Sequence, residues 1–117
     1  MPKILKYIGT VERGVKRGQV LGFPTANIPL TDREISGIYA GRVKVGTFTY
    51  ESAVFADQKR NVLEAYLLDF TGDLYGKELT IELHQKIRET GEFVDDDTLK
   101  KQIADDVAKT REYFQTL

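Results

Sequence analysis

One carboxylate stands in the middle of a strongly apolar stretch of this 117-residue sequence. In a strand over residues 62–70, Glu64 would share one face with apolar and aromatic neighbours, namely Val62, Tyr66, Leu68 and Phe70. Burying an unpaired carboxylate is costly, and desolvation raises its pKa toward the range that a general base needs near neutral pH. Glu64 is therefore a candidate general base. Alternatively, it is an edge-strand glutamate that pairs with Arg42, Lys59 or Arg60.

A second group of polar residues follows Pro24. In the extended backbone that neighbouring prolines favour, Thr25 and Asn27 are two residues apart and point to the same side. Their hydroxyl and amide oxygens are neutral ligands that suit Mg²⁺, which also binds substrate phosphates. The sequence thus offers a magnesium site at Thr25 and Asn27. Alternatively, both side chains bond to the local backbone of a proline-bounded turn.

Residues 9–22 combine several glycines with positive charge. Glycines allow the backbone N–H groups to approach a ligand closely, and basic side chains add charge, so the segment suits a phosphate cradle. Its spacing matches neither the Walker A loop nor the Gly-x-Gly-x-x-Gly fingerprint. A flexible β-hairpin tip with solvated basic residues is therefore the alternative. The candidate phosphate-binding residues are Gly14, Lys16, Arg17, Gly18 and Gly22.

Hydrophobic periodicity predicts the elements that must position these residues. Strands are expected over residues 1–9, 38–45, 47–56, 62–70 and 79–87. Residues 23–29, with two prolines, are expected to form an edge strand or an extended loop, so the strands number five or six. The alternation in the last of them predicts that His84 lies on an exposed, polar face. From residue 96 the period becomes helical, with Asp96 or Asp97 as the expected N-cap residue. These elements predict a mainly β domain, a sandwich or a barrel, with one amphipathic helix that covers an open end or face.

Composition limits the function and the surroundings of the chain. Its length, with 41% hydrophobic and 30% charged residues, fits one globular domain over residues 1–117. The absence of cysteine and the single histidine exclude thiolate and multi-histidine metal sites within this sequence. No apolar run approaches a membrane span and no signal-peptide pattern begins the sequence, so we expect a cytoplasmic monomer without membrane contact. A net charge of −1 gives no basic footprint for nucleic acid.

Several motifs, taken in order, resemble those of the riboflavin kinase (flavokinase) family, and in particular the kinase module of bacterial bifunctional riboflavin kinase/FAD synthetases. The match runs from about Lys6 to Arg111. The resemblance implies a six-stranded Greek-key β-barrel with a C-terminal α-helix. The motifs are Leu-Gly-Phe-Pro-Thr-Ala-Asn at 21–27, Gly-Ile-Tyr-Ala at 37–40, Leu-Glu-Ala-Tyr-Leu-Leu-Asp-Phe at 63–70, Asp-Leu-Tyr-Gly-Lys at 73–77, and the spaced residues of 87–93 and 99–106.

The resemblance also implies an activity, the transfer of the ATP γ-phosphate to the 5′-hydroxyl of riboflavin with Mg²⁺, which yields FMN and ADP. It maps the base onto Glu64, the magnesium and phosphate ligands onto Thr25 and Asn27, and the loop over the ATP phosphates onto residues 14–22. The flavin contacts are expected at Tyr66, Arg88 and Phe93. Phosphoryl transfer depends mainly on positioning and charge stabilisation, which these residue types can supply.

The sequence departs from the family pattern in two places. Residues 52–61 are shorter than the family's Asn-Ile-Gly-like stretch with its proline motif, and Tyr66 stands where histidine is common. The first departure motivates an alternative, a flavin-binding module without catalysis; a nucleic-acid-binding barrel is a third hypothesis, which the charge disfavours. The adenylyltransferase module of the bifunctional enzymes is absent from this sequence, so FAD synthesis would fall to another protein if the sequence is complete.

Overall fold

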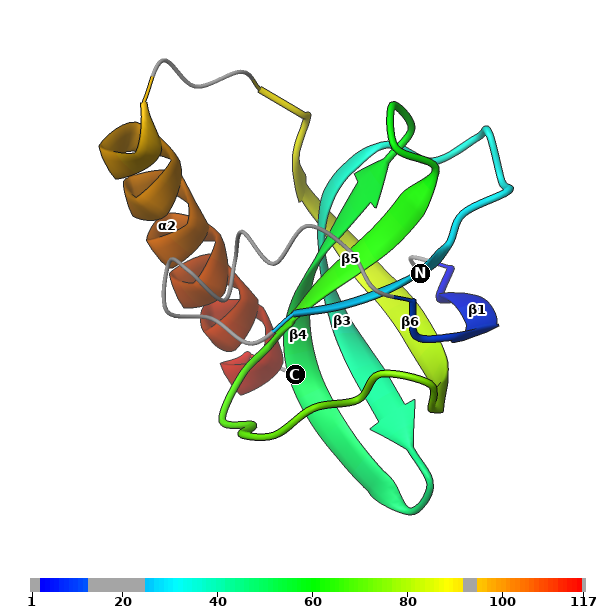
Figure 1. The fold of residues 1–117 in the computed structure, drawn as a ribbon. Helices are drawn as coiled ribbons and strands as arrows, with labels where there is room; N and C mark the ends of the chain where they lie inside the picture. The colour runs from blue at the N-terminus through cyan, green and yellow to red at the C-terminus, as the bar shows by residue number, and fades with distance from the viewer. Residues whose placement is uncertain (1–2, 13–24, 92–94, 117) are drawn as a thin grey trace.

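The computed structural model describes residues 3–12, 25–91 and 95–116, and these ranges hold six strands and one helix (Figure 1). The helix is α2 (Asp96–Gln115). The strands are β1 (Leu5–Thr10), β2 (Thr25–Pro29), β3 (Gly37–Val45), β4 (Phe48–Asp57), β5 (Val62–Leu67) and β6 (Glu78–Arg88). Each of these elements falls within or close to a range predicted from the sequence, so the number and order of the elements are confirmed.

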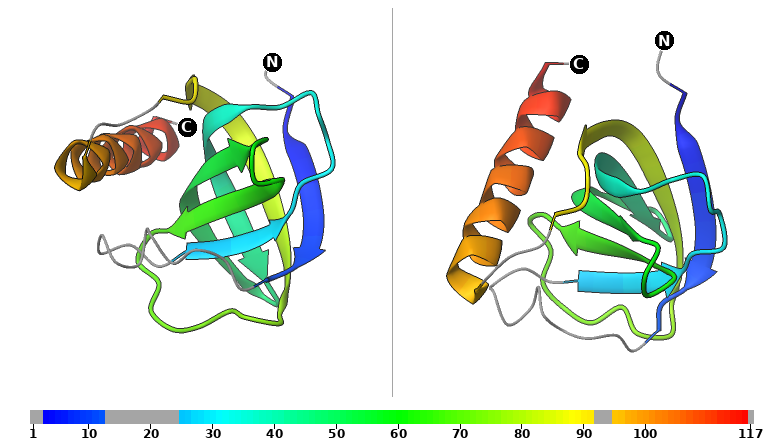
Figure 2. Two further views of the ribbon diagram at one scale, coloured as in Figure 1. Left: turned by 45° about the horizontal axis from the view of Figure 1, so that its top comes forward. Right: turned by 90° about the horizontal axis from the view of Figure 1, so that it is seen from above.

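The six strands form one antiparallel sheet in the order β1-β6-β3-β4-β5-β2. The sheet curls, so its end strands β1 and β2 approach each other (Figure 2). There the backbone N–H of Glu12 donates to the carbonyl oxygen of Asn27 at 2.8 Å. The structure confirms the predicted mainly β fold with a C-terminal helix, and the sheet forms a curled half-barrel. Because β5 has a partner strand on each side, Glu64 is not on an edge strand.

The two faces of the curled sheet pack against different partners. Side chains of the inner face form the main core, with Ile28, Val54 and Leu63 among its fully buried members. Helix α2 lies against the outer face, over β3, β4 and β6 (Figure 2). There its buried Ile103 contacts Tyr66. Since side chains of a strand alternate between faces, the residues at positions 64 and 66 share the outer face, beside the helix.

The helix begins at Asp96, as the helical period predicts, but its N-cap residue is neither of the two predicted. Asp95 is the N-cap residue, and its carboxylate accepts a hydrogen bond from the backbone N–H of Thr98 at 2.8 Å. The expected caps, Asp96 and Asp97, instead lie in the first turn, where their charge complements the helix dipole. The predicted apolar stripe is confirmed, because Leu99 and Val107 flank Ile103 against the sheet. Within the described residues, no helix is long and apolar enough to cross a membrane.

The prediction that His84 is exposed is wrong. Its exposed fraction is 7%, and the aromatic rings of Tyr113 and Phe114 pack edge-on against its imidazole. Its Nε2 lies 3.3 Å from Oε1 of Glu82, which is also buried. The last turns of α2 thus cover the face of β6 that the alternation assigned to solvent. The strand pattern could not reveal this, because the covering residues lie about thirty positions away in the sequence.

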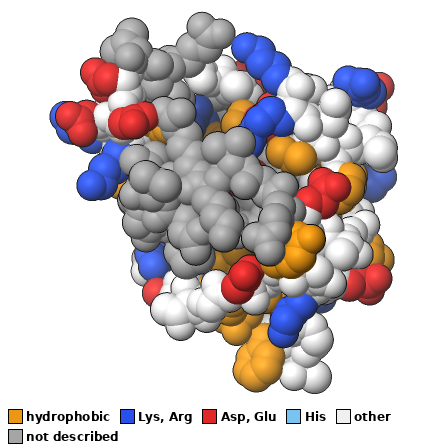
Figure 3. Space-filling view, viewed as in Figure 1, with side chains coloured by type: hydrophobic (Ala, Val, Ile, Leu, Met, Phe, Trp, Pro, Cys, Tyr) orange, Lys and Arg blue, Asp and Glu red, His pale blue; other side chains and the backbone are white. Residues whose placement is uncertain are grey.

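Charged side chains of both signs are mixed over the face seen in Figure 3. Lys and Arg side chains lie near Asp and Glu side chains around the molecule's outline in this view, in keeping with the net charge of −1. Ion pairs among the described residues include that between Lys109 and Asp105, at 3.2 Å within α2.

Candidate active site

The register of neighbouring strands brings four of the predicted site residues, on β2 and β5, onto one face. In the β2–β5 pair, Asn27 lies opposite Glu64 and Thr25 lies opposite Tyr66. On the other side of β5, Phe55 of β4 lies opposite Glu64. Residues directly opposite each other in antiparallel strands project to the same side. The outer face of the sheet therefore gathers a hydroxyl, an amide, a carboxylate and a phenol, and the phenol of Tyr66 lies against α2.

Glu64 is the most deeply buried charged group of this face, with an exposed fraction of 2%. Its Oε1 accepts hydrogen bonds from the Tyr66 hydroxyl at 3.0 Å and from Nη2 of Arg60 at 3.3 Å. Its Oε2 is buried and has no partner among the described residues. Burial raises the pKa of the Glu64 carboxyl above its usual value, although Arg60 and Tyr66 oppose the shift. The group is thus a buried carboxylate with one oxygen available to accept a proton.

Tyr66 can only donate in its contact with Glu64. Burial and the nearby carboxylate raise the pKa of the Tyr66 phenol far above its usual value, so it stays protonated. The ring packs beside Ile103 of the helix, while the hydroxyl reaches the carboxylate. At the position where the sequence resemblance leads us to expect histidine, Tyr66 therefore donates a hydrogen bond to the Glu64 carboxylate.

Asn27 has the second buried oxygen of this face without a partner. The side chain is 5% exposed, and its Oδ1 has no hydrogen bond among the described residues. Buried carbonyl oxygens are rarely left unpaired, and such an atom often marks the place of an ion or a water molecule. The alternative that Asn27 bonds to the local backbone of a turn gains no support, because Oδ1 of Asn27 bonds to no described backbone group. An amide oxygen here, with the Thr25 hydroxyl two residues before it, fits the hard oxygen donors that Mg²⁺ prefers.

Arg60 and Asp57 complete the surroundings of Glu64. The Arg60 guanidinium donates from Nε to Oδ2 of Asp57 at 2.6 Å and from Nη2 to Glu64. Sequence reasoning named Arg60 only as one of three ion-pair partners, and it missed Asp57. Glu64 therefore pairs with Arg60, as the alternative interpretation predicts, but it does not lie on an edge strand. Asp57 carries a weak sequence signal, since an acidic residue before a turn often bonds to backbone N–H groups two or three positions on.

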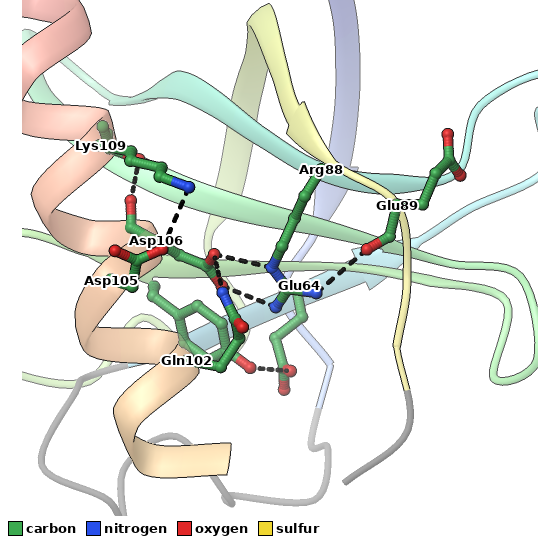
Figure 4. A network of polar contacts seen from close by, with 9 residues as sticks. Glu64, Arg88, Glu89, Gln102, Asp105, Asp106 and Lys109 are labelled. Carbon is green, nitrogen blue, oxygen red and sulfur yellow. Dashed lines mark hydrogen bonds and ion pairs between the residues drawn. The ribbon is translucent and has the colours of Figure 1, made fainter. Parts of the chain in front are cut away.

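Arg88, which is expected to contact the flavin, bonds to the helix (Figure 4). Its Nε and Nη2 each donate to Asp106 at 2.8 Å, and its Nη1 donates to the carbonyl oxygen of Glu89 at 3.1 Å. Asp106 is fully buried and also accepts from Gln102 at 3.2 Å. Sequence reasoning gave Asp106 no role, although its place three residues after Ile103 puts it on the buried stripe of the helix.

A small pocket lies between this ion pair and the sheet. Its volume is about 50 Å³, well below the roughly 300–1,000 Å³ of ligand pockets for drug-sized molecules. Its lining is mostly apolar, with Arg88 and Asp106 as its charged members. The lining residues are Ile38, Phe55, Tyr66, Arg88, Thr90, Gly91, Leu99, Ile103 and Asp106.

The remaining predicted site residues lie outside the described residues. They are Gly14, Lys16, Arg17, Gly18, Gly22 and Phe93.

Comparison with known proteins identifies the family. The family model for riboflavin kinase (flavokinase) matches residues 1–114. A bifunctional riboflavin kinase/FMN adenylyltransferase of Escherichia coli (strain K12) is 37% identical over 121 residues, covering 91% of this chain and 37% of the relative. The trifunctional relative from Mycoplasmoides gallisepticum is 36% identical, with 91% of this chain and 18% of the relative covered. The chain thus spans well under half the length of these curated relatives.

Solved structures agree with the sequence comparison. Riboflavin kinase from Trypanosoma brucei superposes with a TM-score of 0.68 at 28% identity, covering 96% of this chain and 80% of that one. A Streptococcus pneumoniae protein described as a macrolide-efflux protein gives a TM-score of 0.79 at 28% identity, over 94% of this chain and 38% of that one. With a family match over nearly its whole length, this chain belongs to the riboflavin kinase (flavokinase) family.

Proposed function

We propose that this domain transfers the γ-phosphate of ATP to the 5′-hydroxyl of riboflavin and so forms FMN and ADP. Family membership supports the reaction class. The observation that carries the assignment to this site is the cross-strand pair of Asn27 and Glu64, each with a buried oxygen lacking a partner among the described residues. One oxygen suits a cation and the other suits a proton, and phosphoryl transfer to an alcohol requires both.

Glu64 acts as the general base in this proposal. Its Oε2 accepts the proton of the riboflavin hydroxyl while that oxygen attacks the γ-phosphorus. The bond from this phosphorus to the β–γ bridging oxygen breaks, and ADP leaves with the bonding electrons. Burial keeps the pKa of Glu64 above its usual value, which brings its basicity closer to that of an efficient base at neutral pH.

Thr25 and Asn27 are the residues of the described ranges that would hold Mg²⁺, together with the phosphate oxygens of ATP. The ion would neutralise charge on the transferring phosphoryl group. The chain's own contribution is to keep the two side chains on one strand, with Asn27 fixed by backbone bonds to both Glu12 and β5. Residues 14–22 remain the proposed cradle for the ATP phosphates, and Phe93 remains a proposed flavin contact.

The flavin is proposed to bind on the Tyr66 side of the small pocket, whose apolar lining suits an aromatic ring system. Because the pocket is far smaller than an isoalloxazine needs, binding must widen the space between the sheet and α2. Arg88 is proposed to act there through its bond to Asp106, which ties the end of β6 to the helix.

The test is a chromatographic assay of FMN formed from riboflavin, ATP and Mg²⁺. Wild-type protein is expected to form FMN, and the Glu64→Gln variant is expected to lose nearly all turnover while it keeps its fold by circular dichroism. Glu51→Gln, which alters a half-buried carboxylate of the neighbouring strand β4, is the matched control and should keep its turnover. Undiminished turnover in Glu64→Gln would remove Glu64 as the base. Flavin binding without ATP-dependent turnover in wild type would favour the non-catalytic alternative.

A further inference from the structure

Arg60 connects two buried carboxylates beside the proposed base. Its Nε lies 2.6 Å from Oδ2 of Asp57, and its Nη2 lies 3.3 Å from Oε1 of Glu64. The Arg60 side chain is 38% exposed, whereas those of Asp57 and Glu64 are 9% and 3% exposed. One half-exposed cation thus covers two acidic groups that face the protein interior.

The turn between β4 and β5 fixes Asp57 independently of the Arg60 side chain. Oδ1 of Asp57 accepts hydrogen bonds from the backbone N–H groups of Lys59 at 3.0 Å and of Arg60 at 3.1 Å. Asn61, with a φ of 57°, completes the reversal into β5. Since the backbone bonds hold Asp57, its Oδ2 is a fixed acceptor for Nε of Arg60. That bond in turn directs Nη2 toward Glu64, four residues further along the chain.

The donors around Glu64 all reach the same oxygen. Within the described part of the chain, Arg60 and Tyr66 both bond to Oε1, and nothing bonds to the buried Oε2. A carboxylate held at one oxygen by donors from two directions has a fixed rotamer. Its second oxygen is then held in one place, on a residue that lies opposite Asn27 in the strand register.

We propose that Arg60 is a positioning residue for phosphoryl transfer, holding Oε1 of Glu64 so that Oε2 is the atom that receives the proton of the substrate hydroxyl. The inference rests on the proposed function and adds a residue to it. Arg60 itself touches neither substrate in this scheme. Because displacing a reacting group by about 1 Å can cost on the order of 100-fold in rate, the loss of this contact should appear in turnover.

Replacing Arg60 removes a cation from the buried carboxylate of Glu64, so a loss of stability is expected unless that carboxyl takes up a proton. Asp57 keeps both backbone hydrogen bonds when the Arg60 side chain is replaced. The thermal midpoint of each variant therefore separates a loss of folding from a loss of positioning. Arg111→Ala is the matched control, since Arg111 forms a two-point ion pair with Asp69 in an exposed place.

The experiment measures kcat, the riboflavin KM and the thermal midpoint for wild type, Arg60→Ala, Arg60→Gln and Arg60→Lys. We expect Arg60→Ala and Arg60→Gln to lower kcat by roughly 10- to 100-fold with a nearly unchanged KM for riboflavin. Arg60→Lys should recover part of the loss, because an ammonium can still reach Oε1. Arg111→Ala should match wild type in kcat. If Arg60→Ala fails to fold, Arg60→Gln and Arg60→Lys give the comparison.

An unchanged kcat in a folded Arg60→Ala protein would overturn the inference, and so would a rise in KM alone, which would make Arg60 a substrate contact. If wild type forms no FMN, the proposed function fails, and a crystal structure of Arg60→Ala then decides the role of Arg60. A Glu64 side chain in a new or second rotamer supports positioning, and an unchanged rotamer overturns it.

Discussion

Asn27 and Glu64 lie opposite each other on adjacent strands, and each has a buried oxygen atom without a hydrogen-bond partner in the described part of the chain. Leaving a buried polar atom unpaired costs about 1–3 kcal/mol. Two such atoms on opposite residues therefore lower the stability of the fold at the place where a substrate and a cation could pair with them. Stability and activity should respond in opposite directions to changes at these two residues.

Replacing Glu64 by Gln should stabilise the domain at neutral and higher pH. The raised pKa of Glu64 means that the fold favours its protonated form, so wild type loses stability as the pH rises through the folded-state pKa. We expect Glu64→Gln to be more stable than wild type by about 0.5–2 kcal/mol near pH 8. The difference should shrink as the pH falls toward the ordinary carboxyl value of about 4.3. Urea unfolding at both pH values measures it.

Glu82→Gln is the control of opposite sign. Burial would raise the pKa of Glu82, but its contacts with His84 and Lys44 outweigh burial and leave the pKa below its usual value. The ionised form therefore stabilises the fold above the ordinary pKa, and that stability is lost as the pH falls through the lowered value. Glu82→Gln should be less stable than wild type near pH 8. A loss of stability in both variants at that pH would contradict the sign assigned to Glu64.

Asn27→Leu should raise the thermal midpoint and weaken the response to magnesium. The substitution removes a buried amide that lacks a partner for its oxygen, so we expect about 1 kcal/mol of added stability. In the FMN assay, much more Mg²⁺ should be needed for half-maximal turnover. Ser52→Ala is the control, because the Ser52 hydroxyl is also buried without a partner among the described residues but lies on the opposite face of the sheet from Asn27. An unchanged Mg²⁺ requirement in Asn27→Leu would remove Asn27 as a ligand.

Tyr66→Phe should shift the pH dependence of turnover to higher pH. The hydroxyl of Tyr66 lowers the pKa of Glu64, so its removal should raise that pKa and move the acidic limb of the profile upward. A several-fold loss of kcat should accompany the shift, because one of the two donors to Oε1 is gone. Tyr50→Phe, whose ring packs against Phe70 at 5.0 Å, serves as the control. A profile of Tyr66→Phe that overlays that of wild type would show that the hydroxyl does not influence the base.

Arg88→Ala should be strongly destabilising, unlike Arg111→Ala. Both arginines form two-point ion pairs with an aspartate, but Asp106 has a side chain 1% exposed whereas that of Asp69 is 78% exposed. Loss of Arg88 leaves a buried charge without its cation, at a cost of about 3–5 kcal/mol. Loss of Arg111 should cost less than about 1 kcal/mol. Denaturant unfolding compares the two, and equal small losses would show that Asp106 gains water or a new partner.

The strands and the helix could be predicted from local sequence, because each pattern depends on neighbours within a few positions. The alternation that gave β6 and the stripe around Ile103 are examples. The environment of His84 could not be predicted, since the residues that bury it belong to the far end of α2. The Arg88–Asp106 pair likewise joins positions eighteen residues apart, and only the packing of the helix on the sheet selects it.

The candidate site was predictable to a different extent for each residue. Glu64, Thr25 and Asn27 could be singled out because their types are unusual for their positions, yet the register that sets Asn27 against Glu64 required the structure. Arg60 was one of several basic residues within reach in the sequence. The backbone hydrogen bonds of Asp57, which decide where Arg60 points, depend on a turn geometry that composition alone does not specify.

Tyr66 belongs to both the pocket and the base. Its ring lines the space between the sheet and α2, and its hydroxyl is bonded to Glu64. Any molecule that displaces the Tyr66 ring on entering this space also changes the hydrogen bond from its hydroxyl to Glu64. Binding in the pocket and protonation of Glu64 are therefore thermodynamically linked. By the same reciprocity, protonation of Glu64 alters the affinity of the pocket for its occupant. Under the proposed function, occupancy of the flavin site would thus adjust the reactivity of the base beside it.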